Sequence, residues 1–270
     1  MRRVFKVIAV AGGVAAGLSA FATLTSAIGG VWGDYQVDDR RSGYTYASAE
    51  TRAMQDDDFV NPAMLRVDQG EEIWSTVEGD AGKSCASCHD DAADSMRGVA
   101  ASYPQYRDSL GKLQNIEQRI NQCRVDNMQA EPWKWESSPL LAMTVYVRHQ
   151  SRGMPVSVAI DGPAAPFYDK GKEFFNQRRG LLDMACKHCH QDFAGNKVRA
   201  NTLSEGQING FPVYRLKWQN VGSTHRRFRG CNKQVRAQPY GYGSEEYVNL
   251  ELFVAWRGRG LLVETPAVRN

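Results

Sequence analysis

Two copies of the pattern C-x-x-C-H constrain this chain more than any other feature. They read CASCH at residues 85–89 and CKHCH at residues 186–190. In this pattern two thiols add across the two vinyl groups of a haem, and the adjacent histidine is held beneath the iron. A redox-active or zinc-binding cysteine pair is the alternative, but the histidine and the duplication favour covalent haem. We therefore expect two haem c groups, attached and ligated by the motif residues Cys85, Cys88, His89, Cys186, Cys189 and His190.

The sequence around the motifs is itself repeated. GEEIWSTVEGDAGKSCASCH (70–89) aligns with GKEFFNQRRGLLDMACKHCH (171–190) at a constant offset of 101. Two further matches follow at offsets of 108 and 107: YPQYR (103–107) with FPVYR (211–215), and YVRHQSRG (146–153) with FVAWRGRG (253–260). Each half thus has an amphipathic, aromatic-bearing helix before its haem motif and an apolar, helix-like run after it. This order is typical of a cytochrome c domain.

The predicted fold is mainly α, with two tandem cytochrome c-like domains that each bind one haem covalently. The repeat places the first domain at residues 63–156 and the second, with the active site, at residues 157–270. Residues 28–62 have no clean periodicity and form an N-terminal arm. This arm could pack on a partner, but an extended lead-in is the simpler expectation.

Residues 1–27 have the pattern of a signal peptide. A basic start, MRRVFK, precedes an apolar run rich in glycine and alanine that ends in TSA. Cleavage near Ala27 is expected, because this run is weakly hydrophobic for an uncleaved membrane anchor. The mature protein is therefore expected to be periplasmic, without stable membrane insertion.

Charge is unevenly distributed along the mature chain. The formal excess of +3 belongs to the signal, which contains Arg2, Arg3 and Lys6. Residues 34–192 carry 18 basic and 25 acidic side chains, whereas residues 193–270 carry 12 and 5. A short basic end on an otherwise neutral exported protein suggests an anionic substrate or an acidic partner rather than nucleic acid.

Two cysteines, Cys123 and Cys231, lie outside the haem motifs. A disulfide between them is the ordinary expectation in an oxidising compartment. The repeat disfavours it, because each cysteine lies 20 residues after the start of YPQYR or FPVYR and four residues after an arginine, Arg119 or Arg227. Equivalent positions of two separate haem pockets are not expected within the roughly 4–7 Å between α-carbons that a disulfide requires.

The distal ligand of the second haem is the role that this position suggests for Cys231. Methionine is the usual distal ligand, but the second half has none after Met184, which precedes the haem motif. Cys231 and His225 are the strong candidates, and Lys217 and Lys233 are weaker ones. A thiolate ligand would stabilise ferric iron and lower the reduction potential.

In the first half the repeat points to Cys123 as distal ligand. Three methionines are also available there, Met96, Met128 and Met143. His188, inside the second motif, is expected to be a spacer.

The segment RRFRGCNKQVR, residues 226–236, surrounds Cys231 with four arginines and a lysine. Such cations lower the pKa of a thiol and keep its thiolate populated. A reactive sulfur in a basic pocket suits catalysis on an anionic sulfur compound. A plain electron carrier needs neither feature, and a dihaem peroxidase, the third possibility, needs an open or displaceable distal site.

At these residues the chain closely resembles the SoxA family, the dihaem subunits of the SoxAX cytochromes of bacterial thiosulfate oxidation. The most specific parts are the two haem motifs, the segment RFRGCNKQVRAQPY and the closing GRG region. The resemblance implies that Cys231 ligates the active-site haem and is the catalytic residue, carried as a persulfide in the family. It also implies that Arg227 binds substrate and that Cys123 ligates the other haem, so that the metal ligands are His89, Cys123, His190 and Cys231.

The activity that this resemblance implies is haem-dependent L-cysteine S-thiosulfotransferase. Thiosulfate is oxidatively coupled to the carrier cysteine of SoxY, and electrons pass to cytochrome c. The implied partners are SoxX, a monohaem cytochrome c that forms a heterodimer, and the SoxYZ carrier as protein substrate. The alternative is a periplasmic dihaem electron-transfer cytochrome c without sulfur chemistry.

Overall fold

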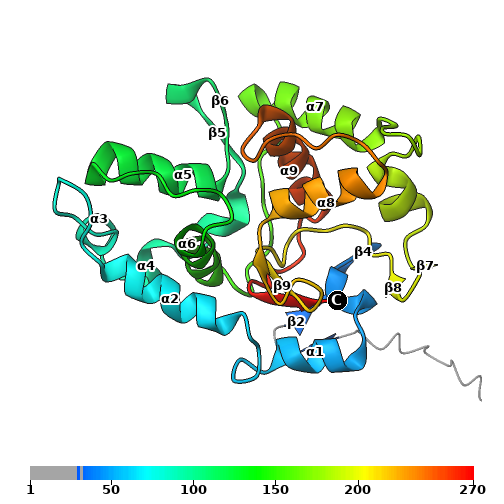
Figure 1. The fold of residues 1–270 in the computed structure, drawn as a ribbon, viewed down its shortest axis with the longest axis horizontal. Coiled ribbons are helices and arrows are strands. Elements are labelled where there is room, and N and C mark those ends of the chain that lie inside the picture. Colours follow the sequence, from blue (N-terminus) through cyan, green and yellow to red (C-terminus); the bar gives the residue numbers. More distant parts are fainter. Residues whose placement is uncertain (1–28, 31–32) are drawn as a thin grey trace, which may run out of the picture.

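A helix before the C-x-x-C-H motif, a pair of short strands and two further helices follow one another in the same order in both halves of the chain. The computed structural model describes residues 29–30 and 33–270 (Figure 1), and the predicted signal, residues 1–27, falls outside them. The longer helices are α1 (Ala49–Asp56), α2 (Met64–Ser75), α5 (Ile116–Cys123), α6 (Ser138–His149), α7 (Ala165–Asn176), α8 (Thr224–Gln234) and α9 (Glu245–Arg257). The shorter helical segments are η1 (Gly43–Tyr46), α3 (Ala86–His89), α4 (Ala92–Ser95), η2 (Val99–Ser102), η3 (Asp108–Leu110), η4 (Arg124–Met128), η5 (Gly162–Ala164) and η6 (His188–Asp192).

The strands are only two or three residues long, so the expectation of a mainly α-helical fold is confirmed. Four antiparallel pairs are β1 (Gly29–Gly30) with β2 (Gly33–Asp34), β3 (Gln36–Val37) with β4 (Arg40–Arg41), β5 (Gln105–Arg107) with β6 (Lys112–Gln114), and β7 (Lys197–Val198) with β8 (Asn201–Thr202). The central strand of a three-stranded sheet is β9 (Val213–Arg215), antiparallel to β10 (Asn220–Gly222) and parallel to β11 (Ala267–Arg269). Across the part of the chain that the structure describes, every helix is too short or too polar to span a membrane.

Local signals in the sequence set the ends of the helices that carry the repeat. α9 begins after Ser244, whose side chain accepts a hydrogen bond from the backbone N–H of Tyr247. Glu245 and Glu246 lie in its first turn and Arg257 in its last, charges that favour the two ends of the helix dipole. In α7, Pro166 lies in the first turn, where a missing N–H leaves no hydrogen bond unmade.

The first and last helices of each half cross at a glycine. A Cβ at Gly70 in α2 would lie 2.6 Å from the carbonyl oxygen of Ala142 in α6. A Cβ at Gly171 in α7 would lie 2.9 Å from the Cβ of Phe253 in α9 and would also clash with the carbonyl oxygen of Asn249. The two crossings therefore bring backbone against helix backbone, which only glycine permits.

A second pair of glycines lies where the loop before each C-x-x-C-H motif meets the end of the helix that carries the third cysteine of that half. Gly79 and Gly180 both have φ of +70°, and a Cβ added at either would clash with the carbonyl oxygen of Met128 or Val235. The neighbouring N–H groups of residues 80 and 81 donate to residues 129 and 128, and those of residues 181 and 182 donate to residues 236 and 235. The two halves thus share one backbone framework at these loops.

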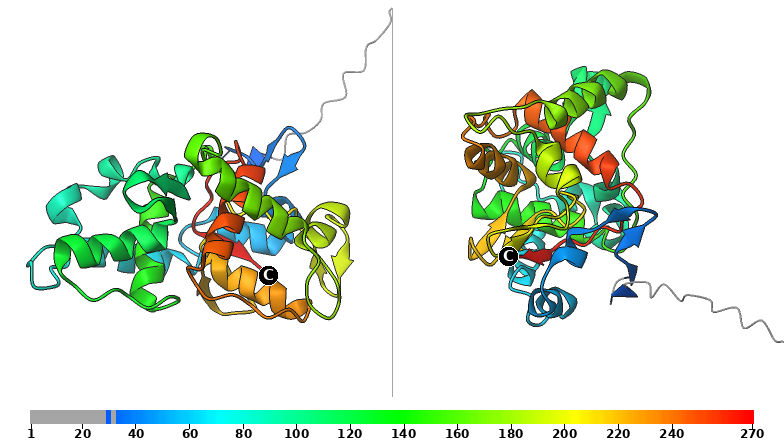
Figure 2. Two further views of the ribbon diagram at one scale, coloured as in Figure 1. Left: turned by 90° about the horizontal axis from the view of Figure 1, so that it is seen from above. Right: turned by 90° about the vertical axis from the view of Figure 1, so that its right-hand side faces the viewer.

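Two hydrophobic cores form around the two helix crossings. Trp74, Met143 and Tyr146 are among the buried residues of the first, and Phe175, Leu250 and Phe253 among those of the second. Figure 2 shows the two groups of helices as neighbouring lobes, with the N-terminal arm lying against the second. The cores interlock at their border, where Val221 of β10 belongs to the first core.

The N-terminal arm packs on its own chain, and is not an extended lead-in. Within α1, Gln55 is almost fully buried, and its Oε1 accepts a hydrogen bond from the N–H of Val268 in β11 at 3.1 Å. Its Nε2 donates to Glu264 at 3.2 Å. Asn61 donates to the carbonyl oxygen of Pro266 at 2.9 Å. A polar segment therefore forms part of the second lobe because its amide side chains complete buried hydrogen bonds there.

We predict that Gly171→Ala lowers the free energy of unfolding by about 1–3 kcal/mol, because the new methyl group must push α7 away from α9. Denaturant unfolding of the haem-loaded protein, followed by far-ultraviolet circular dichroism, measures this change. The matched control is Gly230→Ala in α8, where an added Cβ meets nothing within 4 Å. That variant should be neutral or slightly more stable, since alanine favours helix over glycine. Equal effects would contradict the crossing constraint.

Candidate functional site

The second haem motif lies on a tight turn that follows α7 and ends in η6. His188 is inside this turn, and its Nδ1 accepts a hydrogen bond from the N–H of Ala185 at 2.9 Å. The His188 ring therefore caps the turn.

His190 is oriented by a backbone carbonyl group. Its Nδ1 lies 2.8 Å from the carbonyl oxygen of Ser204. A carbonyl oxygen can only accept, so Nδ1 donates this bond, and Nε2 is left for the contact with Cys231 or for a metal. Gly206 packs against the ring, where an added Cβ would lie 2.8 Å from Cγ of His190.

Cys231 projects from α8 toward this histidine. The helix begins after Ser223, whose hydroxyl accepts from the N–H of Arg226 at 3.1 Å. Burial raises the pKa of Cys231, but the charge of Arg227, a hydrogen bond with His190 and the charge of Arg215 bring that pKa down to about 7. The thiol is thus held in a cationic environment beside the imidazole.

The residues brought together here fit a covalent haem c. Burial and, to a lesser extent, the nearby Cys231 raise the pKa of Cys186 to about 12. Burial and Cys231 also raise the pKa of Cys189. Two attachment thiols, an imidazole oriented through its Nδ1 and a facing thiol form the donor set that a haem c with histidine and cysteine ligands requires.

Only part of the basic cluster 226–236 faces the thiol. Arg226 lies over the ring of Trp218 at 4.4 Å and pairs with Glu136 at 3.7 Å. Arg229 donates to the carbonyl oxygen of Tyr240 and lies over the ring of Tyr242. The side chains of Lys233 and Arg236 are exposed. Of the four arginines and one lysine in this segment, only Arg227 is therefore close enough to act on the Cys231 sulfur.

The second arginine at the sulfur, Arg215, comes from β9 and was missed by the sequence analysis. Burial and the charge of Arg227 lower its pKa to about 10, and Cys231 opposes this effect. Its Nε donates to the backbone oxygen of Asn270 at 2.6 Å. The signal was present in the repeat, since Arg215 ends FPVYR as Arg107 ends YPQYR.

His225, the competing candidate for the distal position, has both ring nitrogens occupied elsewhere. The residue is fully buried, its Nδ1 accepts from the N–H of Gly243 at 3.0 Å, and its Nε2 donates to Glu251 at 3.1 Å. The ring also stacks on Trp135 with centroids 5.0 Å apart. His225 therefore joins the two halves of the chain, and Lys217 and Lys233, the weaker candidates, are exposed.

The first half repeats this arrangement around Cys123, the last residue of α5. Burial raises the pKa of Cys123; Arg119 and Arg107 oppose the rise, whereas Asp126 adds to it. The pKa of Cys85 is raised to about 11 by burial and by Cys123. The structure thus brings Cys85 and Cys123 together, but the balance of charge differs from that at Cys231.

His89 and the free thiols complete the first site. The His89 ring lies 5.8 Å from that of Trp74, whose Nε1 donates to the carbonyl oxygen of Asp90 at 2.9 Å. All six cysteines lie in the described part of the chain, and no disulfide joins any two of them, Cys123 and Cys231 included. Met128 and Met143 are buried in the protein interior.

Comparisons with known sequences identify relatives of this chain. A family model described as SoxA/TsdA, cytochrome c domain, matches residues 69–156. The chain is 49% identical to the L-cysteine S-thiosulfotransferase subunit SoxA of Pseudaminobacter salicylatoxidans, over 86% of this chain and 82% of that protein. It is 47% identical to SoxA of Rhodovulum sulfidophilum, over 86% of this chain and 81% of that protein.

A solved structure shares the fold as well as the sequence. The crystal structure of SoxXA from P. pantotrophus has a TM-score of 0.83 and 44% sequence identity, covering 86% of this chain and 87% of that chain. With relatives this similar over most of both lengths, the chain belongs to the SoxA family of L-cysteine S-thiosulfotransferase subunits.

Proposed function

We propose that the chain carries two haem c groups, one in each of two tandem cytochrome c-like domains at residues 63–156 and 157–270. Cys85 and Cys88 attach the first, with His89 and Cys123 as ligands. Cys186 and Cys189 attach the second, with His190 and Cys231 as ligands. The repeated backbone framework and the matching position of the third cysteine in each half support this assignment.

The chain is an L-cysteine S-thiosulfotransferase subunit, and Cys231 is its catalytic residue. The observation that carries this assignment is the position of one thiol beside His190 with two arginines, Arg227 and Arg215, directing positive charge at it. A sulfur nucleophile and an anion site at the same place suit thiosulfate, which is both an anion and a sulfur donor.

The overall reaction joins thiosulfate to the thiol of the carrier subunit SoxY. It yields a cysteine S-thiosulfonate, one proton and two electrons, and two molecules of oxidised cytochrome c accept the electrons. A haem ligated by His190 and Cys231 supplies the one-electron redox chemistry at this site.

The residues of the chain divide the sulfur chemistry into two steps. First, a bond forms between the Cys231 sulfur and the sulfane sulfur of thiosulfate, as the pair gives up two electrons. The carrier thiolate then attacks that sulfane sulfur, and Cys231 leaves as a thiolate, as in thiol–disulfide exchange. Arg227 and Arg215 hold the sulfonate oxygens through charge-assisted hydrogen bonds and stabilise the departing thiolate.

Two partners follow from this function. SoxX, a monohaem cytochrome c, forms the heterodimer, since a related SoxA chain is found in a SoxXA complex. SoxYZ is the protein substrate, and the reaction takes place in the periplasm. The alternative, a dihaem electron carrier without sulfur chemistry, is not favoured, because such a carrier has no use for an arginine pair at a ligand thiol.

Cys231→Ala should abolish thiosulfate-dependent reduction of cytochrome c in the presence of SoxX and SoxYZ, while both haems stay attached. Intact mass checks haem content, and a Cys231 peptide of the wild type should include a fraction heavier by one sulfur that reduction removes. Cys123→Ala is the matched control and should keep substantial turnover, because Asp126 offsets the arginines there. Normal turnover of Cys231→Ala with full haem content would falsify the catalytic assignment.

His225→Gln should leave the ferric electron paramagnetic resonance spectrum unchanged, since the ring bonds to Glu251 and Gly243. Cys231→Ala should alter that spectrum, which is expected to have the narrow g-spread of thiolate ligation. If His225→Gln changed the spectrum and Cys231→Ala left it unchanged, His225 rather than Cys231 would be the ligand.

Arg227→Ala should lower kcat/KM for thiosulfate by roughly 10- to 150-fold, since a charge-assisted contact is worth about 1.5–3 kcal/mol. Arg227→Lys should be less impaired, because it keeps the charge but loses the planar fork. The control is Arg226→Ala, one residue away on the same helix, whose partners are Trp218 and Glu136. Equal kinetics in the two alanine variants would show that Arg227 belongs to a solvated surface.

A further inference from the structure

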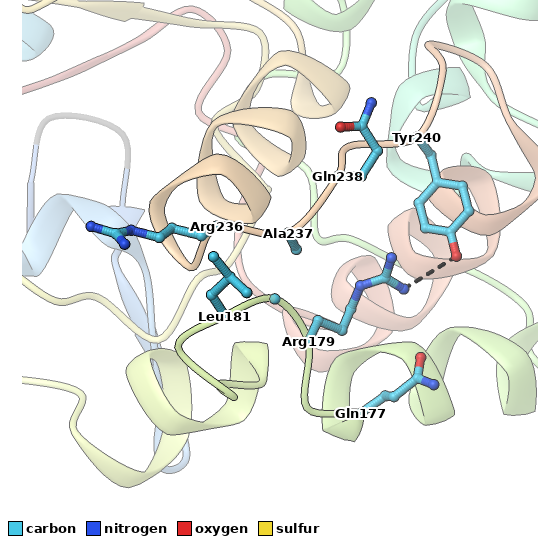
Figure 3. Close-up of a pocket in the computed structure, with 8 residues that line it drawn as sticks. Gln177, Arg179, Leu181, Arg236, Ala237, Gln238 and Tyr240 are labelled. Carbon is cyan, nitrogen blue, oxygen red and sulfur yellow. Dashed lines mark hydrogen bonds between the residues drawn. The ribbon is translucent and has the colours of Figure 1, made fainter.

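An open pocket of about 420 Å³ lies beside the C-terminal end of α8 (Figure 3). Residues 177–181 of the haem-attachment loop form one wall and residues 236–240 the other. Hydrogen bonds from Leu181 to the Arg236 carbonyl and from Leu182 to the Val235 carbonyl join the walls. The N–H of Val235 bonds in turn to the carbonyl oxygen of Cys231. The pocket is therefore one helical turn from the proposed catalytic residue.

The guanidinium of Arg179 is held in this pocket without an acidic partner. It lies between the rings of Phe174 and Tyr240, 4.6 and 4.7 Å from their centroids, and donates to the Tyr240 hydroxyl at 3.2 Å. Its Nε is buried and has no hydrogen-bond partner among the described residues. Within residues 33–270 no ion pair includes Arg179. Figure 3 shows Arg236 extending the other way, so of the two arginines that line the pocket only Arg179 reaches the Tyr240 hydroxyl.

The first half has a carboxylate at the equivalent place. By the repeat, Glu78 corresponds to Arg179 and Trp133 to Tyr240. There Arg124 lies over the Trp133 ring at 3.6 Å and pairs with Glu78 at 2.5 Å. The first half thus contains an aromatic ring, a guanidinium and a carboxylate. In the second half the guanidinium of Arg179 stands at the position of the carboxylate and Asn232 at the position of Arg124, so the ring and a guanidinium are present without a carboxylate from the described residues.

The rim of the pocket also carries less negative charge than the equivalent surface of the first half. Asp80 and Glu131 of the first half correspond to Leu181 and Gln238 of the second. The side chain of Leu181 is 81% exposed, and Leu182 beside it is 49% exposed. A free anion gains nothing from an exposed leucine, whereas a protein surface does, and an arginine next to apolar side chains is a common anchor of protein interfaces.

We propose that this pocket is a docking subsite for a carboxylate side chain of the carrier protein substrate. Its carboxylate pairs with Arg179, as Glu78 pairs with Arg124, and an apolar side chain beside it covers Leu181. The proposal rests on the proposed function for the identity of the partner. The partner is the carrier because its cysteine must reach Cys231, which shares α8 with the pocket.

Arg179→Gln tests the subsite in the full-length, haem-loaded protein. KM for the carrier should rise roughly tenfold, because one charge-assisted contact is lost, whereas kcat and KM for thiosulfate stay unchanged. Arg179→Lys should recover part of the loss. The control is Arg178→Gln, since Arg178 is exposed and paired with Asp183 at 2.9 Å, and its kinetics should match the wild type.

A binding measurement makes the test independent of turnover. Carrier protein with its cysteine blocked is titrated onto immobilised wild type and variants at low and high salt. Arg179→Gln should bind more weakly and with a shallower salt dependence than wild type. Equal affinity of Arg179→Gln and Arg178→Gln overturns the proposal, as does a rise in KM for thiosulfate instead of the carrier. If the wild-type protein shows no turnover, the proposed function is contradicted. The docking subsite is still tested, because the binding measurement does not depend on turnover.

Discussion

Backbone contact at glycine is the constraint on which both halves of this protein depend. Gly70 and Gly171 let the first and last helices of each half touch, and Gly79 and Gly180 then fix the haem-attachment loop against the helix that carries the third cysteine. A side chain at Gly70 or Gly171 would push the crossing helices apart, and one at Gly79 or Gly180 would separate the loop from the cysteine-bearing helix. The spacing between attachment thiols and facing thiol therefore follows from the backbone, and the side chains around it are free to differ.

The two halves use that freedom for different electrostatics. Each third cysteine lies near two arginines, at positions 107 and 119 or 215 and 227. In the first half the effect is opposed by Asp126, and the pKa of Cys123 stays raised. In the second half no acid is among the main influences on Cys231, and the cations outweigh burial. One repeated backbone framework thus gives two different environments. The surroundings of Cys123 raise the pKa of its thiol, whereas those of Cys231 suit a reaction with an anion.

Much of this could be predicted from the sequence, because the repeat carries three-dimensional information. Aligning the halves placed Cys123 and Cys231 at equivalent points and made a disulfide improbable, and the free thiols agree. Proximity along the chain was a weaker guide to which side chains lie close to the Cys231 sulfur. It grouped Arg226, Arg229 and Lys233 with the sulfur, although side chains on a helix point in different directions. It also missed Arg215, which a strand brings from a distant segment. The packing of the arm could not be foreseen either, since its buried side chains are polar and show no hydrophobic pattern.

The contact between that arm and β11 has a consequence for how the second lobe folds. β11 pairs with β9 and is covered by α1, so the second lobe combines segments from opposite ends of the described chain. A lobe assembled in this way is complete only when residues 267–269 are in place. Without β11, Gln55 would lose the backbone N–H of Val268 that it accepts from, and β9 would lose its parallel neighbour. The two ends of the described chain therefore belong to one cooperative unit.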